Sequence, residues 1–417
     1  MTDKPRCEIQ SDRMAEMLAK LIACDTSFPP GSNYQAFSDL LELLFAPLGG
    51  KVQRVEVPAA LWQAPGVEGR RVNLIVRPDM GPADAPEALI YFHTDTAPVG
   101  DGWTRPALAL SVEGERLFGR GAADMKGTIV SVFDALMRLR DEGRSLAFRP
   151  VLAFCTDEEG GIYPGIRYLA ETIKLPDILL NLNGSAEPRI WAGCLGSLDL
   201  VLNLQGRTAH SGTPEKGINA VAAATDALVA LGAFGQTLRA RHTQMPPPPW
   251  ADGPLCAQLS VTAIHGGDKG SAIPGACQVT LNRRYLPEEN AADVTAEIKE
   301  LLEAALKDSE LLGWDLTEVG HLPPVSDPDG PATDRWTQAR AAAFDVPLHD
   351  FTRYGSGTSS DFGWVQRAGI QHMLLGGLSR PDRNVHAADE FTTFDDLIDL
   401  SKAIENFFDA QFELKTP

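Results

Sequence analysis

Histidine and carboxylate side chains follow short apolar runs, or lie in glycine-rich turns, at three places in the first half of the chain. They are His93, Asp95, Asp124, Glu158 and Glu159. Imidazole and carboxylate groups are suitable ligands for zinc and similar divalent ions. A metal-bound water can become hydroxide near neutral pH and attack a carbonyl, but a free carboxylate must then carry the proton to the leaving nitrogen. The adjacent pair Glu158 and Glu159 could divide these tasks, so the pattern predicts a metal site with a carboxylate base beside it.

Hydrophobic periodicity predicts the elements that must position these groups. Apolar runs at 72–76, 88–92 and 151–154 predict short buried strands, and the pattern at 34–48 predicts a helix before them. The pattern at 128–139 predicts a helix between the last two strands. Strands that alternate with helices indicate an α/β layer with a largely parallel sheet. Functional groups in such sheets gather beyond the carboxyl ends of the strands, which is where the histidine and the glutamates fall.

The sequence pattern changes near residue 197, where alternating strands and a long helix at 291–306 indicate an α+β insertion. The α/β pattern returns near residue 315. We therefore predict an α/β catalytic domain with a largely parallel mixed sheet flanked by helices, in two parts, 1–196 and 315–417. A smaller α+β lid or dimerisation domain, 197–314, interrupts it.

Length, charge and cysteine content limit the class of protein. The 417 residues are too many for one ordinary core, which supports two domains. The net charge of −19 disfavours nucleic acid and anionic membrane surfaces as partners. We find no apolar stretch of membrane-spanning length and no signal-like segment, so a cytoplasmic location is expected. The six cysteines are scattered without a C-x-x-C pair, as expected of reduced thiols.

Five motifs occur in a fixed order: His-x-Asp, Gly-x-Asp-x-Lys-Gly, Asp-Glu-Glu-Gly, His-Ser-Gly and Val-His-x-x-x-Glu. Together they resemble the zinc metallopeptidase family of acetylornithine deacetylase, succinyl-diaminopimelate desuccinylase, carboxypeptidase G and aminoacylase. The resemblance covers nearly the whole chain. It implies a catalytic domain interrupted by a lid that often dimerises, and hence a homodimer formed through the lid. It also implies two zinc ions bridged by an aspartate and a water, and cobalt or manganese can substitute for zinc.

The resemblance implies a role for each motif residue. The implied metal ligands are His93, Asp124, Glu159 and His386, with Asp124 bridging both ions. Asp95 would orient the imidazole of His93, and Glu158 would be the general base. In the insertion, His210 would stabilise the oxyanion. Arg284 would bind a substrate carboxylate, with Arg283 as an open alternative, and Gly357 would lie in a glycine-rich turn beneath the substrate.

The chain departs from the family pattern at the last ligand of the His93 zinc, where an aspartate or glutamate is expected. By its distance from the preceding strand, Asn183 occupies this position. By local sequence, Glu187-Pro188 matches the Glu-Pro of the family instead. An asparagine oxygen is a weaker ligand than a carboxylate, so we take Asn183 as the candidate ligand and expect one of the two metal sites to be weak.

These observations favour an amidohydrolase or peptidase that cleaves the amide of an N-acyl amino acid or dipeptide-like substrate. Hydrolysis of a ureido or carbamoyl nitrogen remains open, because it needs the same metals and base. A non-catalytic metal-bound protein that binds small molecules is the alternative from another class. The free carboxylate of Glu158 argues against it, because a structural site needs no base beside the metal.

Overall fold

The computed structural model describes residues 6–414, which form two compact units. The first unit comprises the chain up to Trp191, Pro328–Arg353 and the chain from Val365 onward, and the second comprises Ala192–Asp327 and Tyr354–Trp364. The domain limits predicted above stay predictions. The limit after residue 314 falls inside strand β14 (Gly313–Leu322) of the second unit.

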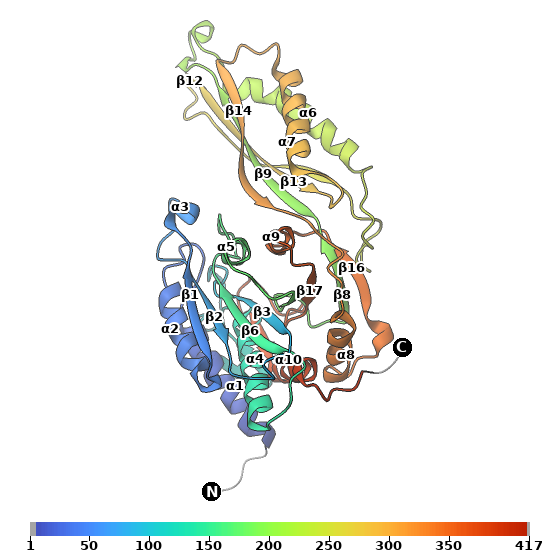
Figure 1. Ribbon diagram of the computed structural model, residues 1–417. Coiled ribbons are helices and arrows are strands. Elements are labelled where there is room, and N and C mark those ends of the chain that lie inside the picture. Colours follow the sequence, from blue (N-terminus) through green and yellow to red (C-terminus); the bar gives the residue numbers. More distant parts are fainter. Residues whose placement is uncertain (1–5, 415–417) are drawn as a thin grey trace. The chain divides into compact units, whose positions relative to one another are not determined.

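The first unit is built on a six-stranded mixed sheet (Figure 1). In spatial order its strands are β1 (Lys51–Glu56), β2 (Val72–Arg77), β6 (Arg149–Cys155), β3 (Glu87–His93), β7 (Ile178–Asn181) and β17 (His372–Leu375). The strands from β6 to β17 run parallel, and β1 and β2 join antiparallel. Strands β2, β3 and β6 are almost continuously apolar and buried, as in sheets covered on both faces. The predicted largely parallel mixed sheet is confirmed.

Helices pack around one core with this sheet. The longer ones are α1 (Arg6–Ala23), α2 (Tyr34–Phe45), α4 (Lys126–Asp141), α8 (Thr333–Ala343) and α10 (Phe394–Phe408). Three shorter helices lie outside this core: α3 (Ala59–Trp62), α5 (Gly165–Thr172) and α9 (Phe362–Arg367), of which α9 begins in the second unit and ends in the first. Helix α2 ends before the predicted residue 48 and continues as a 3₁₀ turn, Ala46–Leu48. The cause is Pro47, which has no N–H to continue the α-helical hydrogen bonds.

Two three-stranded sheets lie in the first unit and at its borders with the second. The strands of one are β4 (Ser111–Glu113), β5 (Arg116–Phe118) and β18 (Phe391–Thr393). Those of the other are β8 (Arg189–Cys194), β15 (Val325–Ser326) and β16 (Thr352–Ser356). Phe118 pairs with Phe391, so the loop that follows β5 lies beside the segment that precedes β18.

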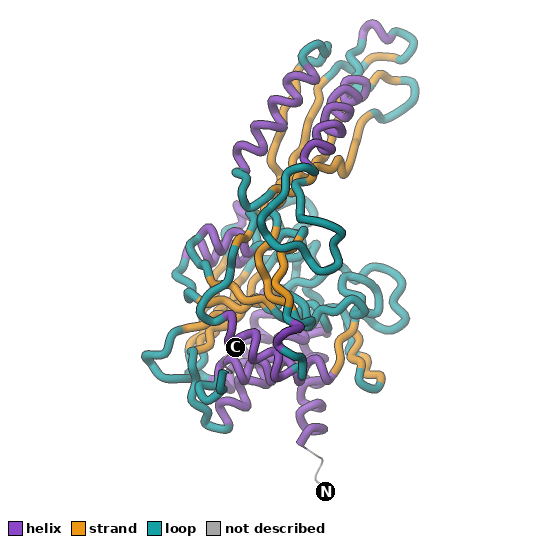
Figure 2. Tube along the Cα trace, turned by 90° about the vertical axis from the view of Figure 1, so that its right-hand side faces the viewer, coloured by secondary structure: helices purple, strands orange, loops and turns teal. Residues whose placement is uncertain are grey.

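The second unit is a four-stranded antiparallel sheet with two long helices (Figure 2). Its strands in spatial order are β11 (Gln258–Gly266), β13 (Ala276–Tyr285), β9 (Gly196–Gln205) and β14. A two-stranded ladder joins β10 (Ala209–His210) to β12 (Ala272–Ile273). Helices α6 (Ala220–Leu238) and α7 (Ala291–Leu306) pack against each other and share the core of the sheet. Every second residue of β9 is buried from Leu198 to Leu204, as its alternating sequence predicts.

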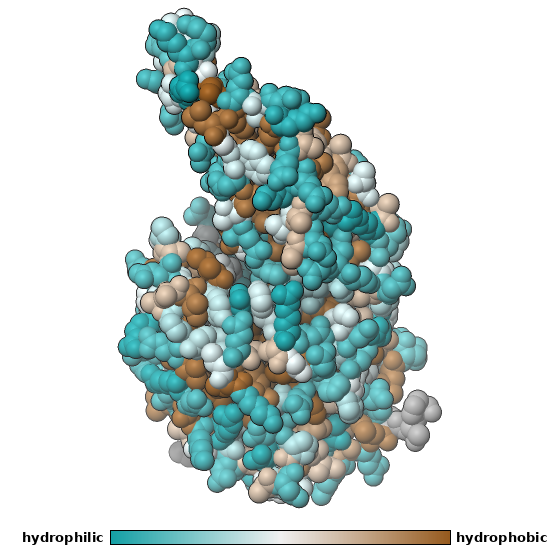
Figure 3. Space-filling view, turned by 45° about the horizontal axis from the view of Figure 1, so that its top comes forward, coloured by the Kyte–Doolittle hydropathy of each residue, from teal (hydrophilic) through white to brown (hydrophobic). Residues whose placement is uncertain are grey.

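Helix α6 overturns one expectation from the sequence. By length and composition it is apolar enough to cross a membrane, whereas we expected no such stretch. In the second unit, Ala224, Ala227 and Leu231 of this helix are buried in the core that it shares with the sheet. Val229 of the same helix is 68% exposed. Figure 3 likewise shows apolar side chains gathered in patches among hydrophilic ones on the face that it presents.

Candidate metal centre

The parallel pairing of β3 with β6 places the first and third sequence motifs, His-x-Asp and Asp-Glu-Glu-Gly, at one edge of the sheet. His93, the last residue of β3, is in register with Cys155, the last residue of β6. The acidic turn that carries Glu158 and Glu159 follows Cys155 immediately. The carboxyl ends of parallel strands meet at the same edge, so the imidazole and both carboxylates are delivered there together.

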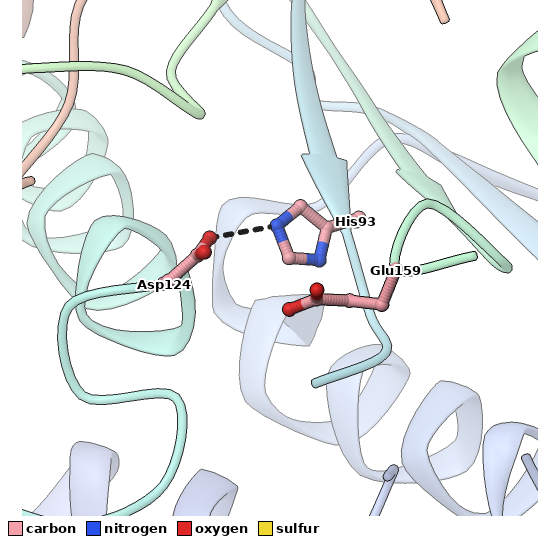
Figure 4. A group of neighbouring side chains, drawn as sticks. All are labelled: His93, Asp124 and Glu159. Atoms are coloured by element: carbon pink, nitrogen blue, oxygen red, sulfur yellow. Dashed lines mark hydrogen bonds and ion pairs between the residues drawn. The ribbon is translucent and has the colours of Figure 1, made fainter. Parts of the chain in front are cut away.

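The imidazole of His93 is buried and held at both ring nitrogens. Its Nδ1 lies 2.9 Å from the backbone oxygen of Asp95, and its Nε2 lies 2.9 Å from Oδ1 of Asp124. Figure 4 shows the contact between His93 and Asp124 and, beside the ring, the carboxylate of Glu159. One ring nitrogen of His93 and one carboxylate oxygen each from Asp124 and Glu159 lie within 4.8 Å of one another. This spacing suits a divalent cation.

His386 completes the group from the far end of the sequence. Its Nε2 lies 3.2 Å from Oδ2 of Asp124 and 3.0 Å from Oε2 of Glu159. Hydrogen bonds to Asp124 and Glu159 raise the pKa of His386 to about 10. Burial lowers the pKa of His93, but the hydrogen bond and charge of Asp124 outweigh it and the net pKa is well above the ordinary value. The negative charge that raises the pKa of both imidazoles would also stabilise a bound cation, which would displace the protons from the ring nitrogens, so the residues fit a metal.

Asp95 connects His93 to the acidic turn. Its Oδ2 accepts a hydrogen bond of 2.8 Å from the backbone N–H of Glu159, and its Oδ1 lies 3.8 Å from Nδ1 of His93. Burial raises the pKa of Asp95 to about 6. Asp95 thus holds the backbone of Glu159, and the side chain of Glu159 is held as well, because the backbone N–H of Ala97 donates to its Oε1 at 3.0 Å. Its other oxygen therefore remains directed at His386.

Glu158 differs from Glu159 in its surroundings. The side-chain amide of Asn183 donates to its Oε1 at 3.0 Å. Burial raises the pKa of Glu158 to about 7, and the nearby charges of Asp124 and Glu159 add to the effect against the opposing charge of His93. A carboxyl group with a pKa near 7 can both take up and release a proton at neutral pH.

The two alternatives for the missing carboxylate, Asn183 and Glu187, have different neighbours in the structure. Asn183 follows β7 and lies against Glu158, whereas Glu187 forms an ion pair with Arg189 and accepts from Ser185 Oγ at 3.4 Å. The side chain of Asn183 is thus the one brought to the acidic turn. Its role as a metal ligand stays a prediction.

Sequence reasoning missed the residues that support the acidic turn from behind. Asp157 has a left-handed backbone, with φ of 63°, and its carboxylate accepts from Arg71 Nε at 2.8 Å and from Tyr34 Oη at 3.0 Å. The guanidinium of Arg71 is fully buried and lies 4.3 Å from the ring centroid of Trp62. An arginine directly before a buried strand was the only available signal, and it matches no motif.

The other predicted site residues belong to the second unit and are described within it. His210 is exposed on β10, and its Nδ1 accepts a hydrogen bond from the N–H of Gly212 at 3.0 Å. Arg284 donates to Ser359 Oγ at 2.5 Å. Gly357 lies between Ser356 and Thr358, whose hydroxyls are 2.6 Å apart, and a Cβ atom on it would meet only Leu255 at 3.6 Å.

Arg283, the alternative to Arg284, is fully buried and pairs with Glu289 at 2.8 Å. Neighbouring residues on a strand point to opposite faces, so only one of the two arginines can face solvent. The partly exposed Arg284 is the better candidate for a substrate contact.

Residues 89–410 match the family model described as Peptidase family M20/M25/M40. Because this match covers more than half of the chain, the chain belongs to that family, a class of hydrolases that act on amide bonds. The resemblance inferred from the five motifs is confirmed.

Individual proteins agree with this assignment. Acetylornithine deacetylase from Klebsiella pneumoniae (strain 342) is 32% identical over 217 residues, which are 51% of this chain and 54% of that protein. The match therefore spans about half the length of the relative. An M20 family metallo-carboxypeptidase from Sulfolobus solfataricus superimposes with a TM-score of 0.73 at 18% identity, over 95% of this chain and 98% of that chain. A dinuclear metal binding peptidase of the M20 family from Bacillus subtilis gives a TM-score of 0.63 at 14% identity, over 96% and 98%. Identities this low show the fold alone.

Proposed function

We propose that the chain is a metal-dependent amidohydrolase or peptidase that cleaves the amide of an N-acyl amino acid or dipeptide-like substrate. One observation carries the proposal. The imidazole and carboxylate groups of four residues converge: His93, Asp124, Glu159 and His386. A further carboxylate, that of Glu158, accepts a hydrogen bond from the side-chain amide of Asn183 and is not one of the four. The family match and the likeness to acetylornithine deacetylase support the same reaction class.

We propose two metal positions that share Asp124. His93 would hold one ion, and Glu159 with His386 would hold the other, while the neutral amide of Asn183 makes the His93 position the weaker. Zinc, or cobalt or manganese in its place, would polarise the substrate carbonyl and lower the pKa of a water. Imidazole and carboxylate donors suit these ions.

In this mechanism the chain's own residues position groups and move the proton. Glu158 takes a proton from the attacking water at its carboxylate and gives it to the leaving nitrogen. The pKa near 7 supports this double role, because neither protonation state is strongly preferred at neutral pH. Asp95 holds His93 and the backbone of Glu159 in place.

Residues of the second unit would bind the substrate. We propose that His210 donates a hydrogen bond to the oxyanion and that Arg284 binds the free carboxylate of the substrate, above the turn that contains Gly357. The exposure of His210 and the forked guanidinium of Arg284 support these roles.

We also propose a homodimer formed through the second unit. Strand β11 is an edge of its sheet, and Val261 and Ile264 on it are 39% and 48% exposed. Val229 on the neighbouring helix α6 is more exposed still. An open strand edge beside exposed apolar side chains is a surface on which a second copy can pair.

A cytoplasmic location is part of the same proposal. The five cysteines whose side chains the structure describes are all free, as expected in a reducing compartment. Cell fractionation that recovered the protein outside the cytoplasm would contradict it.

The experiment that tests the function is amine release from a panel of N-acyl amino acids and dipeptides by metal-loaded protein, beside Glu158→Gln. The variant should lose about 10²–10⁴-fold in rate with unchanged metal content, because it removes the base and leaves the ligands. Loss of metal from Glu158→Gln would show that the roles of the two glutamates are exchanged. Release from ureido substrates alone would assign the alternative reaction, and no release from either panel by metal-loaded protein would favour a binding protein.

A further inference from the structure

The segment that carries His386 has an unusual backbone. Asn384, His386 and Asp389 have φ angles of 52°, 64° and 55°. Residues other than glycine adopt this left-handed region at a cost in free energy, and they persist there only when surrounding contacts hold them. Asp389 is held by Thr104, whose N–H and hydroxyl donate to its carboxylate at 3.0 and 2.8 Å. The rest of the segment is held by a different pair of residues.

Glu390 binds the loop that carries Asp124 with both of its carboxylate oxygens. Its Oε1 accepts from the N–H groups of Ala123 and Asp124 at 2.9 and 3.1 Å. Its Oε2 accepts from the N–H of Gly121 at 3.1 Å and from Arg120 Nη1 at 2.7 Å. Glu390 and Arg120 are each 1% exposed. Both oxygens are thus already occupied by donors, and Glu390 is no ligand for a metal.

Arg120 binds the segment that carries His386. Its Nη2 donates to the backbone oxygen of His386 at 3.3 Å and to that of Pro98 at 2.9 Å. The backbone N–H of Gly119 donates to the backbone oxygen of Glu390 at 2.9 Å. The two residues therefore join the backbones that carry Asp124 and His386, although they lie 270 positions apart in the sequence.

We propose that Glu390 and Arg120 are positioning residues that set the distance between the metal ligands Asp124 and His386, and thereby the affinity for metal. The proposal rests on the proposed function, because it takes those two side chains as ligands. Neither positioning residue touches the metal or the substrate. They act through the backbone of the ligands, and the charge-assisted hydrogen bonds of a buried carboxylate are strong enough for this task.

Glu390→Gln tests the proposal because an amide has one acceptor oxygen where the carboxylate uses two. Its NH₂ group would face either the backbone N–H groups or Arg120, and that contact is repulsive. Arg120→Lys is the second variant, in case the first fails to fold. It keeps the buried charge but replaces the forked guanidinium, which donates to Glu390 and to the backbone oxygens of Pro98, Val99 and His386, with a single ammonium.

Asp134→Asn is the matched control. Asp134 is a buried carboxylate of the same unit, and it accepts from Gln10 at 2.8 Å and from Ser401 at 2.9 Å, away from the metal ligands. Like Glu390→Gln, this variant replaces a buried carboxylate with an amide. It separates general loss of stability from an effect on metal.

Zinc affinity is measured by competition with a chromogenic chelator, on protein whose folding is verified by circular dichroism. Glu390→Gln and Arg120→Lys should bind zinc about 10–100-fold more weakly than wild type, and Asp134→Asn should bind as wild type does. Excess zinc should restore activity to Glu390→Gln but not to Glu158→Gln, which lacks the base. Wild-type affinity in a folded Glu390→Gln or Arg120→Lys overturns the positioning role. Wild-type protein that binds no zinc overturns the proposed function instead.

Discussion

Arg71→Met is expected to destabilise the first unit strongly. The guanidinium of Arg71 and the carboxylate of Asp157 are 0% and 1% exposed and lie 2.8 Å apart. Removing one partner of a buried ion pair leaves an uncompensated buried charge and costs about 3–5 kcal/mol of unfolding free energy. The lost contacts with Trp62 and Tyr34, whose ring centroids lie 4.3 and 5.0 Å from the guanidinium carbon, add to this cost.

Thermal unfolding measures the effect. A loss of about 3–5 kcal/mol corresponds to a melting temperature roughly 6–20 °C lower for a domain of this size class. Arg70→Met is the matched control, because the preceding arginine forms an exposed pair with Glu56 and its loss should leave the melting temperature unchanged.

The pH dependence of the same variant gives a second test. Burial raises the pKa of Asp157, and Arg71 opposes this effect. Without Arg71 the carboxyl should bind a proton more tightly in the folded state, so the stability deficit should shrink as the pH is lowered through its raised pKa. A melting temperature equal to that of wild type at neutral pH would refute the reasoning, as would a deficit that grows steadily on acidification.

Three further predictions concern metal content, assembly and stability. Asn183→Asp should increase the metal retained after dialysis, and Asn183→Ala should decrease it, as measured by mass spectrometry. If Glu187→Ala changes the metal content and the two Asn183 variants do not, Glu187 is the ligand. Val229→Arg should convert a dimer to a monomer in sedimentation velocity, and Leu43→Arg, at a residue 71% exposed in the first unit, should not; a monomeric wild type would contradict the dimer. Burial raises the pKa of Glu405 from 4.5 to about 7, so wild type should lose stability between these values as the pH rises. Glu405→Gln should abolish this loss, up to about 3 kcal/mol by urea unfolding, and identical pH profiles would refute the assignment.

The sequence alone predicted the elements with a strong local pattern. The buried strands β2, β3 and β6 and the helices α4 and α7 lie where periodicity placed them. Strand β1 was missed, because it is an exposed edge strand with charged residues and shows little apolar periodicity. The five motifs predicted the family, since ligand residues must keep their spacing from the strand or turn that presents them.

Tertiary structure decided what local spacing cannot encode. It distinguished Arg284 from the buried Arg283, and it brought Asn183 rather than Glu187 to the acidic turn. It also revealed Arg71 behind that turn and the pairing of Arg120 with Glu390. Periodicity and motifs report contacts within a few residues along the chain. The partners of a buried charge come from distant segments, and only the folded path of the backbone determines which groups replace its lost water.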